Sequence, residues 1–371
     1  MLKVLELFSG IGSCSKALTN LGIEHEIVDA VEIDKYAVAS FNAIHGTFFE
    51  PQDITKWHKD IDVDLVMHGS PCQDFSVAGK QAGGDEGSGT RSSLMHETVH
   101  IVGKLKPKYV IWENVKNLLS KKHRHNFDAY LERMNELGYK NYYQVLNAKD
   151  YGVPQNRERV FTVSIRLDVP YCWAFKFPAR RPLTKRLKDV LETEVDEKYY
   201  LTEKTLKTYQ RDFGSKGKML DKEKTSSTLT ASMGGGGANV PIIIDGKLDI
   251  KGQDQIKRVY NTDGVSPTLS TMQGGNRQPK VLENPVPEDG VSRTVRASGR
   301  GSTDRHSWDV IRHDMRIRKL TAKECWRLMG FDDADFEKAA KVNSNTQLYK
   351  QAGNSIVVDV LEAILEELLC K

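Results

Sequence analysis

Short runs rich in β-branched residues alternate with amphipathic stretches of helical period between residue 3 and about residue 165. The runs are KVLELF, EIVDAVE, DLVMHG, KYVIWENV, YYQVLN and RVFTVSI. This alternation predicts a mostly parallel sheet with helices on both faces, which is a doubly wound α/β fold. Ligands of such sheets bind at the carboxyl ends of the strands, so the residues that end each run are the first candidates for a site.

The chain's 371 residues exceed the usual size of one domain, and the sequence changes character near residue 178. We therefore predict a first domain over residues 1–178 and a second over 179–316. Residues 317–371 are expected to return to the first domain, because the apolar segment SIVVDVLEAILEELL needs a surface to cover.

Within the second domain, three loosely similar segments join a Thr/Ser-rich stretch to a loop of small residues. They span 225–237, 265–276 and 291–302. Repetition of this kind predicts similar hairpins that present their loops in one direction. The alternative is a low-complexity linker, which the flanking β-branched run VPIIID disfavours.

Composition excludes some classes of protein and leaves others open. No apolar run approaches the roughly 20 residues that span a bilayer, and the N-terminus lacks a secretion cleavage site, so we expect a cytoplasmic protein. The five cysteines are widely spaced and lack a zinc-ligand pattern, which predicts free thiols and no metal. Lys and Arg total 54 against 50 for Asp and Glu, a surplus that permits a polyanionic partner without demanding one.

The segment LFSGIGS places Gly10 and Gly12 after the first strand and before a helix that should begin near Ser13. A backbone turns in this way to approach a bound nucleotide. Glu32 ends the second strand, where a carboxylate can accept hydrogen bonds from ribose hydroxyls. The combination fits either a dinucleotide or S-adenosylmethionine, and it also arises by chance in α/β proteins.

A cysteine follows a proline at the end of another apolar strand, in GSPCQDFSVAG at 69–79. A lone cysteine is usually a buried packing residue. Here Pro71 fixes the backbone before Cys72, and the Gly/Ser-rich loop at 79–93 could close over a substrate, which favours a reactive thiol.

Two further motifs end or begin strands at the same predicted edge. Glu113 ends the strand of IWENV, and an acid beside a thiol suits protonation of a ring nitrogen while the thiolate adds to the ring. In PQNRERVF, Arg157 and Arg159 occupy alternate positions leading into a strand, so both should point to one face and hold a carboxylate, a base carbonyl or a phosphate. A surface acid and solvated arginines are the alternatives.

The ordered set FSGIG, PCQ, ENV, QNRERV and GNS resembles the motifs of the C5-cytosine methyltransferase family, over residues 3–166 and 317–369. The resemblance implies an S-adenosylmethionine-dependent, Rossmann-like methyltransferase domain with a smaller target-recognition domain. Two positions depart from the family pattern. Glu6 stands where the family often has Asp, and Asp74 stands where a proline or a small residue is more common.

The resemblance also assigns residues to a cofactor site and a catalytic site. Glu32 would hold the ribose, and Asp53 with Ile54 would meet the adenine. Cys72 would be the nucleophile and Glu113 would contact the N3 edge of cytosine, while Arg157 and Arg159 would organise the base and the cysteine loop. The remaining cofactor contacts would be Phe8, Gly10, Ile11, Gly12, Ile33, Gly69, Pro71, Leu94, Asn354 and Ser355.

The implied activity is that of a DNA (cytosine-5)-methyltransferase, which attacks a flipped-out cytosine through a covalent cysteine adduct and uses no metal. Double-stranded DNA would be the partner of a monomer, with any cognate restriction endonuclease acting separately. The basic insert would read the target sequence. The candidate DNA contacts are Gln73, Ser76, Arg277, Gln278, Arg296, Arg300 and Arg305.

Three other functions compete with this one. A transfer-RNA cytosine methyltransferase would use the same catalytic domain, but the long insert with its repeats favours DNA. A NAD-dependent oxidoreductase would explain FSGIG and Glu32 and leave the other motifs without a role. A catalytically silent DNA-binding regulator would be expected to lose the thiol or the glutamate, and this chain has both.

Overall fold

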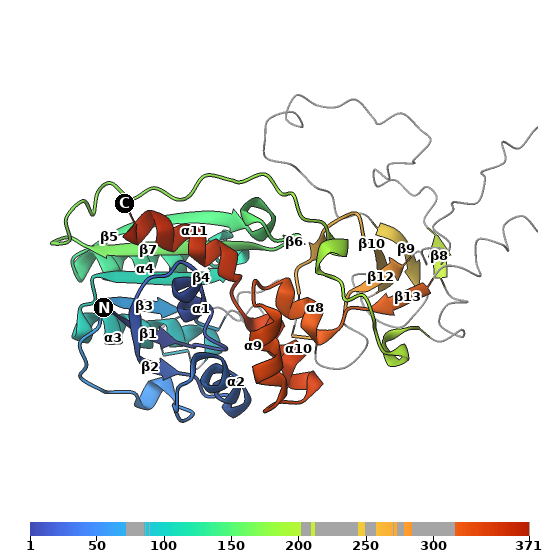
Figure 1. Ribbon diagram of the computed structural model, residues 1–371. Coiled ribbons are helices and arrows are strands. Elements are labelled where there is room, and N and C mark those ends of the chain that lie inside the picture. Colours follow the sequence, from blue (N-terminus) through green and yellow to red (C-terminus); the bar gives the residue numbers. More distant parts are fainter. Residues whose placement is uncertain are drawn as a thin grey trace, which may run out of the picture.

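A computed structural model describes residues 1–71, 85, 87–88, 90–201, 209–211, 244–248, 257–269, 271–272, 278–283 and 316–370. Two larger sheets lie beside each other, with a group of helices between them (Figure 1). Both termini lie on the side of the first sheet that is remote from the second (Figure 1).

The first sheet contains all six predicted runs. Its strands are β1 (Leu2–Leu7), β2 (His25–Val31), β3 (Leu65–His68), β4 (Tyr109–Val115), β5 (Tyr139–Asn147) and β7 (Glu158–Arg166). They lie in the order β2-β1-β3-β4-β7-β5, where β1 to β4 are parallel and β7 is antiparallel to both of its neighbours. The expected doubly wound, mostly parallel sheet is therefore confirmed.

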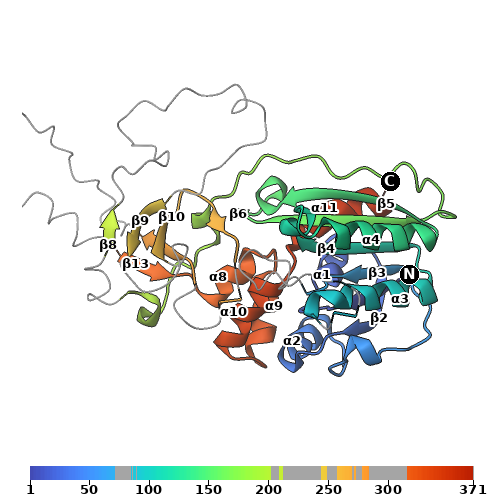
Figure 2. The same cartoon turned by 180° about the vertical axis from the view of Figure 1, so that it is seen from behind.

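Helices cover both faces of this sheet, because the strands are apolar on both sides. On one face, α1 (Ser13–Asn20) and α11 (Val358–Leu369) share a core with Val4 and Ile111 (Figure 1). On the other, α3 (Met95–Leu105) and α4 (Arg124–Glu136) share a core with Leu5 and Trp112 (Figure 2). The C-terminal helix α11 packs in this core, where Leu361 and Ile364 are fully buried.

The second sheet is built from strands that are far apart in the sequence. These are β8 (Tyr209–Arg211), β9 (Ile244–Leu248), β10 (Arg258–Asn261), β12 (Lys280–Glu283) and β13 (Arg316–Lys319), in the order β13-β12-β10-β9-β8. The last strand of this sheet runs from Arg316 to Lys319, so the sheet extends past residue 316. Between the two sheets lie α8 (Ala322–Arg327), α9 (Asp333–Ala340) and α10 (Asn345–Asn354), while α2 (Lys35–His45) packs against α9 (Figure 1).

Short 3-10 helices join these elements. They are η1 (Ile54–Lys56), η2 (Arg91–Leu94), η3 (Lys116–Leu119), η4 (Ala148–Tyr151), η5 (Leu187–Val190) and η6 (Glu197–Tyr199). The last two lie on the long segment that crosses from β7 to the second sheet (Figure 1).

Residues 265–269 and 271–272 belong to the second predicted repeat and lie against the first domain. Strand β11 (Ser266–Pro267) pairs in parallel with β6 (Gln155–Asn156) of the first domain, and Thr268 Oγ1 donates to the Asn156 carbonyl at 2.7 Å. Leu269 and Met272 are buried in the same core as α1 and α11. The hairpin stays a prediction, because residues 270 and 273–276 of this repeat lie outside the described residues. The repeats at 225–237 and 291–302 lie outside the described residues.

Candidate active site

The glycine turn after β1 has the backbone that its residues suggested. Phe8, Gly10 and Gly12 all have positive φ angles, of 53°, 55° and 82°. A side chain added at Gly10 would meet nothing within 4 Å, whereas one at Gly12 would lie 2.1 Å from His45 Nε2. Gly10 therefore borders open space, and Gly12 is required by packing.

Glu32 closes this turn from the end of β2. Its carboxylate accepts hydrogen bonds from the backbone N–H of Gly10 at 3.1 Å and of Asp34 at 2.9 Å. Burial raises the pKa of Glu32, and these backbone hydrogen bonds oppose the rise. The next residue, Ile33, is 70% exposed, which leaves an apolar surface free beside the carboxylate.

Two polar side chains, partly buried His45 and buried Glu6, hold the turn in place, and sequence reasoning assigned neither of them a role in this contact. His45 lies against Gly12, and its Nε2 donates to the Ile11 carbonyl at 3.2 Å. Burial lowers the pKa of His45 to about 4, so the ring stays neutral. Glu6 accepts hydrogen bonds from both the backbone N–H and the hydroxyl of Ser15 at the start of α1. Ile11 itself is buried, so its contribution to a cofactor site would come from its backbone.

The loop that carries Asp53 and Ile54 is fastened beside β2. The Gln52 N–H donates to the Glu32 carbonyl at 2.8 Å, and buried Asp29 accepts from Gln52 Nε2, Trp57 Nε1 and Lys59 Nζ. Asp53 caps η1 and accepts from the Thr55 N–H at 3.0 Å. The signal for Asp29 was a charged residue between the apolar residues Val28 and Ala30 of β2.

The C-terminal GNS motif meets the glycine turn from the other side. Ser355 Oγ lies 2.8 Å from Ser13 Oγ at the first residue of α1, and Asn354 is exposed. Leu94 ends η2 and packs partly buried against the core beneath α3. Residues from opposite ends of the chain thus meet at the start of α1.

The second part of the site lies where β3 and β4 end and β7 begins. Glu113 and Arg159 form an ion pair with 2.9 Å between Glu113 Oε1 and Arg159 Nε, and their side chains are 11% and 17% exposed. The register explains the contact, because Val115 pairs with Arg159 and Glu113 lies two residues earlier on the same face of β4. A side chain at Gly69 would approach Glu113 Oε2 to 3.9 Å.

Arg157 has different partners from Arg159. Its buried guanidinium donates to the carbonyl oxygens of Leu269, Gly353 and Ser355, at 3.2, 3.3 and 2.8 Å. Arg157 therefore ties the QNRER motif to both the insert and the GNS motif. We expected Arg157 and Arg159 to hold the same carboxylate, base carbonyl or phosphate. In the structure, the two side chains contact different groups of the protein.

The chain reaches the predicted nucleophile through Gly69, Ser70 and Pro71. Ser70 is buried and accepts a hydrogen bond from Trp112 Nε1 at 3.0 Å. Cys72, Gln73, Asp74 and Ser76 follow outside the described residues, as do Arg277, Arg296, Arg300 and Arg305 of the insert. Gln278 is described; it lies just before β12 and is partly buried.

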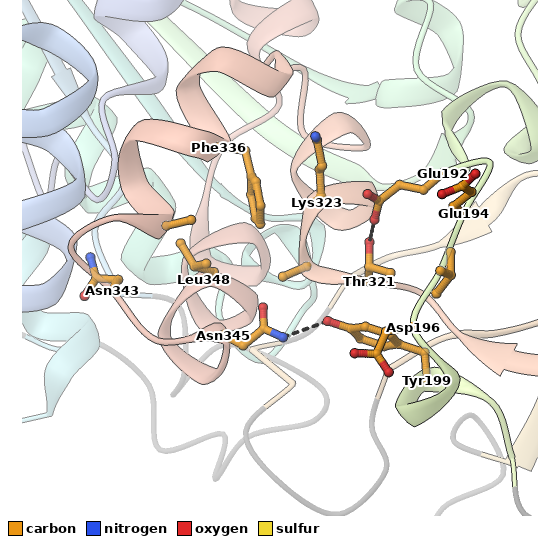
Figure 3. A pocket seen from close by; sticks show the side chains of 13 residues that line it. Glu192, Glu194, Asp196, Tyr199, Thr321, Lys323, Phe336, Asn343, Asn345 and Leu348 are labelled. Atoms are coloured by element: carbon orange, nitrogen blue, oxygen red, sulfur yellow. Dashed lines mark hydrogen bonds between the residues drawn. The ribbon is translucent and has the colours of Figure 1, made fainter.

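A pocket of about 380 Å³ lies elsewhere, between the segment that carries η6 and helices α8 to α10 (Figure 3). Glu192, Glu194, Lys323 and Phe336 are among the residues that line it. None of the predicted site residues lines this pocket.

Within the described ranges, no helix is long and apolar enough to cross a membrane. In the same part of the chain, no group of His, Cys, Asp and Glu side chains could hold a metal. Cys14, Cys172, Cys325 and Cys370 are free thiols.

The sheet order, the glycine turn with its strand-end carboxylate and the acid–arginine pair together define a Rossmann-like methyltransferase fold. Residues 2–370 match the family model of C-5 cytosine-specific DNA methylases, so the chain belongs to that family.

Relatives that are matched over nearly their whole length support the assignment. Orphan methyltransferase M.Rho11sI of Bacillus phage rho11s is 34% identical, over 99% of this chain and 98% of the relative. Type II methyltransferase M.HhaI of Haemophilus parahaemolyticus is 31% identical, over 98% and 93%. Among solved structures, the fold resembles S. pombe Dnmt2 methyltransferase, with a TM-score of 0.61 at 18% identity and 99% coverage of both chains. The protein is therefore a methyltransferase of the cytosine-5 family.

Proposed function

We propose that this protein transfers a methyl group from S-adenosylmethionine to C5 of a flipped-out cytosine in a specific sequence of double-stranded DNA. The observation that carries the proposal is the Glu113–Arg159 pair, which lies at the sheet edge where the chain passes through Ser70 and Pro71 to Cys72. The cofactor turn belongs to the same sheet, with β1 next to β3.

The residues around the glycine turn fit the proposed cofactor. Open space at Gly10 leaves room for a ligand close to the backbone, and Glu32 has a carboxylate at hand for ribose hydroxyls. Exposed Ile33 offers an apolar surface for a purine ring. When bound, the cofactor supplies a methyl group on a sulfonium, which is an electrophile that a carbon nucleophile can attack.

Carbon 5 of cytosine is a weak nucleophile, so the base has to be activated. In the proposed mechanism the Cys72 thiolate adds to C6 and shifts an electron pair toward C5 and N3. Glu113 stabilises the developing charge at N3, and Arg159 holds the Glu113 carboxyl group in place. After C5 has taken the methyl group, a base removes the C5 proton and the C5–H electron pair expels the thiolate, which restores the aromatic ring.

The base cannot react inside the helical stack, so it has to be extruded at a cost of a few kcal/mol, which contacts to base and phosphate offset. We assign Arg159 to the neighbourhood of the base. Arg157 is assigned a positioning role, because its described contacts are with three carbonyl groups of the protein.

The mechanism is tested by trapping the adduct. A duplex with 5-fluorocytosine at the target should become covalently bound to the enzyme in the presence of cofactor, since fluorine at C5 cannot leave as a proton does. Cys72→Ala should abolish both the adduct and methyl transfer while cofactor binding survives. Retention of more than a trace of activity, or the absence of an adduct on a denaturing gel with the wild-type enzyme, would overturn the assignment of Cys72.

The target sequence can be found by bisulfite sequencing of DNA from cells that express the protein.

If the insert reads the bases, replacing residues 180–316 with the equivalent segment of a relative should transfer that relative's target. Ala substitutions at Arg277, Arg296 or Arg300 should then separate base readers, which lose about 1–3 kcal/mol at one position, from phosphate contacts, which weaken all sequences alike. A folded, active chimaera that keeps the original target would place specificity in the catalytic domain, and methylation of RNA alone would favour the RNA enzyme.

A further inference from the structure

Strand β4 holds the segment that leads to Cys72 as well as the catalytic acid. Trp112 and Asn114 are two residues apart on β4, so their side chains lie on the same face of the sheet. The Glu113 side chain lies on the opposite face. Trp112 Nε1 donates to Ser70 Oγ at 3.0 Å, and Asn114 Nδ2 donates to the Ser70 carbonyl at 3.3 Å. Residues 112–114 therefore include the proposed catalytic acid and also hold Ser70, which leads to the proposed nucleophile.

The indole of Trp112 is held in a fixed orientation by a buried aromatic cluster. It stacks on His68 with ring centroids 5.6 Å apart and an interplanar angle of 7°, and its centroid lies 4.1 Å from that of Tyr130. The Tyr130 hydroxyl in turn lies 3.1 Å from His68 Nε2. All three side chains are at most 1% exposed, and burial lowers the pKa of His68 to about 3, so no charge enters the cluster at neutral pH.

Ser70 lies two residues before the proposed nucleophile in the sequence. A single residue, Pro71, separates Ser70 from Cys72, and its ring fixes the backbone φ angle. A displacement of Ser70 is therefore passed on to the residue that carries the nucleophile. Catalysis is sensitive to such displacements, since a shift of about 1 Å at a reacting group can slow a reaction by about a hundredfold.

We propose that Trp112 is a positioning residue for the attack on cytosine, acting through its hydrogen bond to Ser70. This inference rests on the proposed function, in which Cys72 is the nucleophile. Trp112 touches neither base nor cofactor in this scheme. Its role is to keep the segment that leads to Cys72 at a fixed distance from Glu113, because both depend on the same strand.

The test is a double-mutant cycle with Ser70→Ala and Trp112→Phe. The rate of adduct formation with a 5-fluorocytosine duplex is measured in a single turnover, at saturating DNA and cofactor. Each single variant should form the adduct about tenfold more slowly, with the affinities for DNA and cofactor changed less than about twofold. The double variant should be no slower than Ser70→Ala, because Ser70→Ala already removes the Trp112 hydrogen bond, together with the 3.4 Å hydrogen bond from Asn114 Nδ2.

Trp326→Phe is the matched control. Trp326 is also fully buried, and its Nε1 donates to the Leu348 carbonyl at 2.9 Å, away from the cysteine segment. This variant should lower the melting temperature about as much as Trp112→Phe and leave the rate of adduct formation unchanged. Ser70→Ala keeps the aromatic cluster whole, so it tests the inference even if Trp112→Phe fails to fold.

Three results would overturn the inference: Ser70→Ala reacts at the wild-type rate, Trp326→Phe is slowed as much as Trp112→Phe, or the two effects in the cycle multiply. Its failure is distinguishable from failure of the proposed function. If the wild-type enzyme forms no adduct, the assignment of Cys72 fails. If the wild-type enzyme forms one and Ser70→Ala forms it equally fast, only the role of Trp112 fails.

Discussion

Two Glu–Arg pairs in this protein have the same chemistry and different surroundings. Glu324 and Arg318, between α8 and the second sheet, are both fully buried, and the guanidinium binds the carboxylate through two hydrogen bonds of 2.8 Å. Backbone N–H groups of Thr321 and Glu192 donate to the same carboxylate at 2.8 Å. At the proposed catalytic edge, the Glu113 and Arg159 side chains are 11% and 17% exposed, and their 2.9 Å ion pair lacks hydrogen-bond geometry.

The comparison indicates that Glu324 has a structural role, whereas Glu113 can still accept a hydrogen bond from a ligand. Four donors satisfy the Glu324 carboxylate, so it can accept little more without losing an existing bond. Glu113 Oε1 has no hydrogen-bond partner among the described residues, so it keeps capacity for a ligand. Unsatisfied buried groups of this kind are rare in stable proteins and are often found at functional sites.

The largest expected effect comes from breaking the buried pair. Glu324→Ala leaves the Arg318 charge buried without its main partner, so the free energy of unfolding should fall by about 3–5 kcal/mol. Chemical denaturation measures this loss. Combining Glu324→Ala with Arg318→Met should recover part of it, because the unpaired charge is gone. A loss below about 1 kcal/mol in the single variant would contradict the structural role.

Glu113→Gln should have the opposite profile. The methylation rate should fall by about a hundredfold to a thousandfold, since the substitution removes a group that stabilises charge in the transition state. DNA affinity and the melting temperature should change little. Single-turnover kinetics and a binding titration measure the two quantities, and an equal loss in both would make Glu113 a binding residue.

Arg159→Lys sharpens the comparison further. Lysine keeps the positive charge and loses the planar guanidinium, so the rate should fall by about tenfold with stability preserved. Arg157→Lys is the control, because Arg157 donates to three backbone carbonyls. That variant should lose thermal stability as well as rate. If the two variants behave alike in a melting experiment, the distinction between the arginines fails.

The smallest effect concerns Glu6, which is buried like Glu324 and accepts hydrogen bonds from Ser15. Burial raises the pKa of Glu6 from 4.5 to about 7 in the folded protein. The folded state therefore binds the proton more tightly than the unfolded state, and this contribution to stability is lost as the pH rises from about 4.5 through 7. Glu6→Gln should reduce the decline in melting temperature between pH 5 and 8. An unchanged pH profile would contradict it.

Much of the fold and the site could be predicted because function fixes residue types at strand ends. Glu32 and Glu113 each follow an apolar run, and parallel strands bring such ends to one edge whatever the helices contain. The contacts of Arg157 could not be predicted, because its partners are backbone carbonyls at residues 269, 353 and 355. Every residue has a backbone carbonyl, so the sequence does not indicate which carbonyls accept a hydrogen bond from an arginine. Trp112 and Asp29 were missed because a buried tryptophan or a strand acid usually serves packing alone.

The pairing of β11 with β6 has a consequence for engineering new specificities. Ser266 donates its N–H to the Pro154 carbonyl at 2.8 Å, and Arg157 reaches the carbonyl of Leu269. These contacts use mainly backbone atoms, so related enzymes with other side chains could preserve them. Residues 265–269 therefore form a fixed junction between the insert and the first domain. A chimaera can exchange the segments before and after this junction and keep residues 265–269 of the recipient enzyme. Such a chimaera should fold and retain activity with foreign recognition segments more often than one in which residues 180–316 are exchanged as one block.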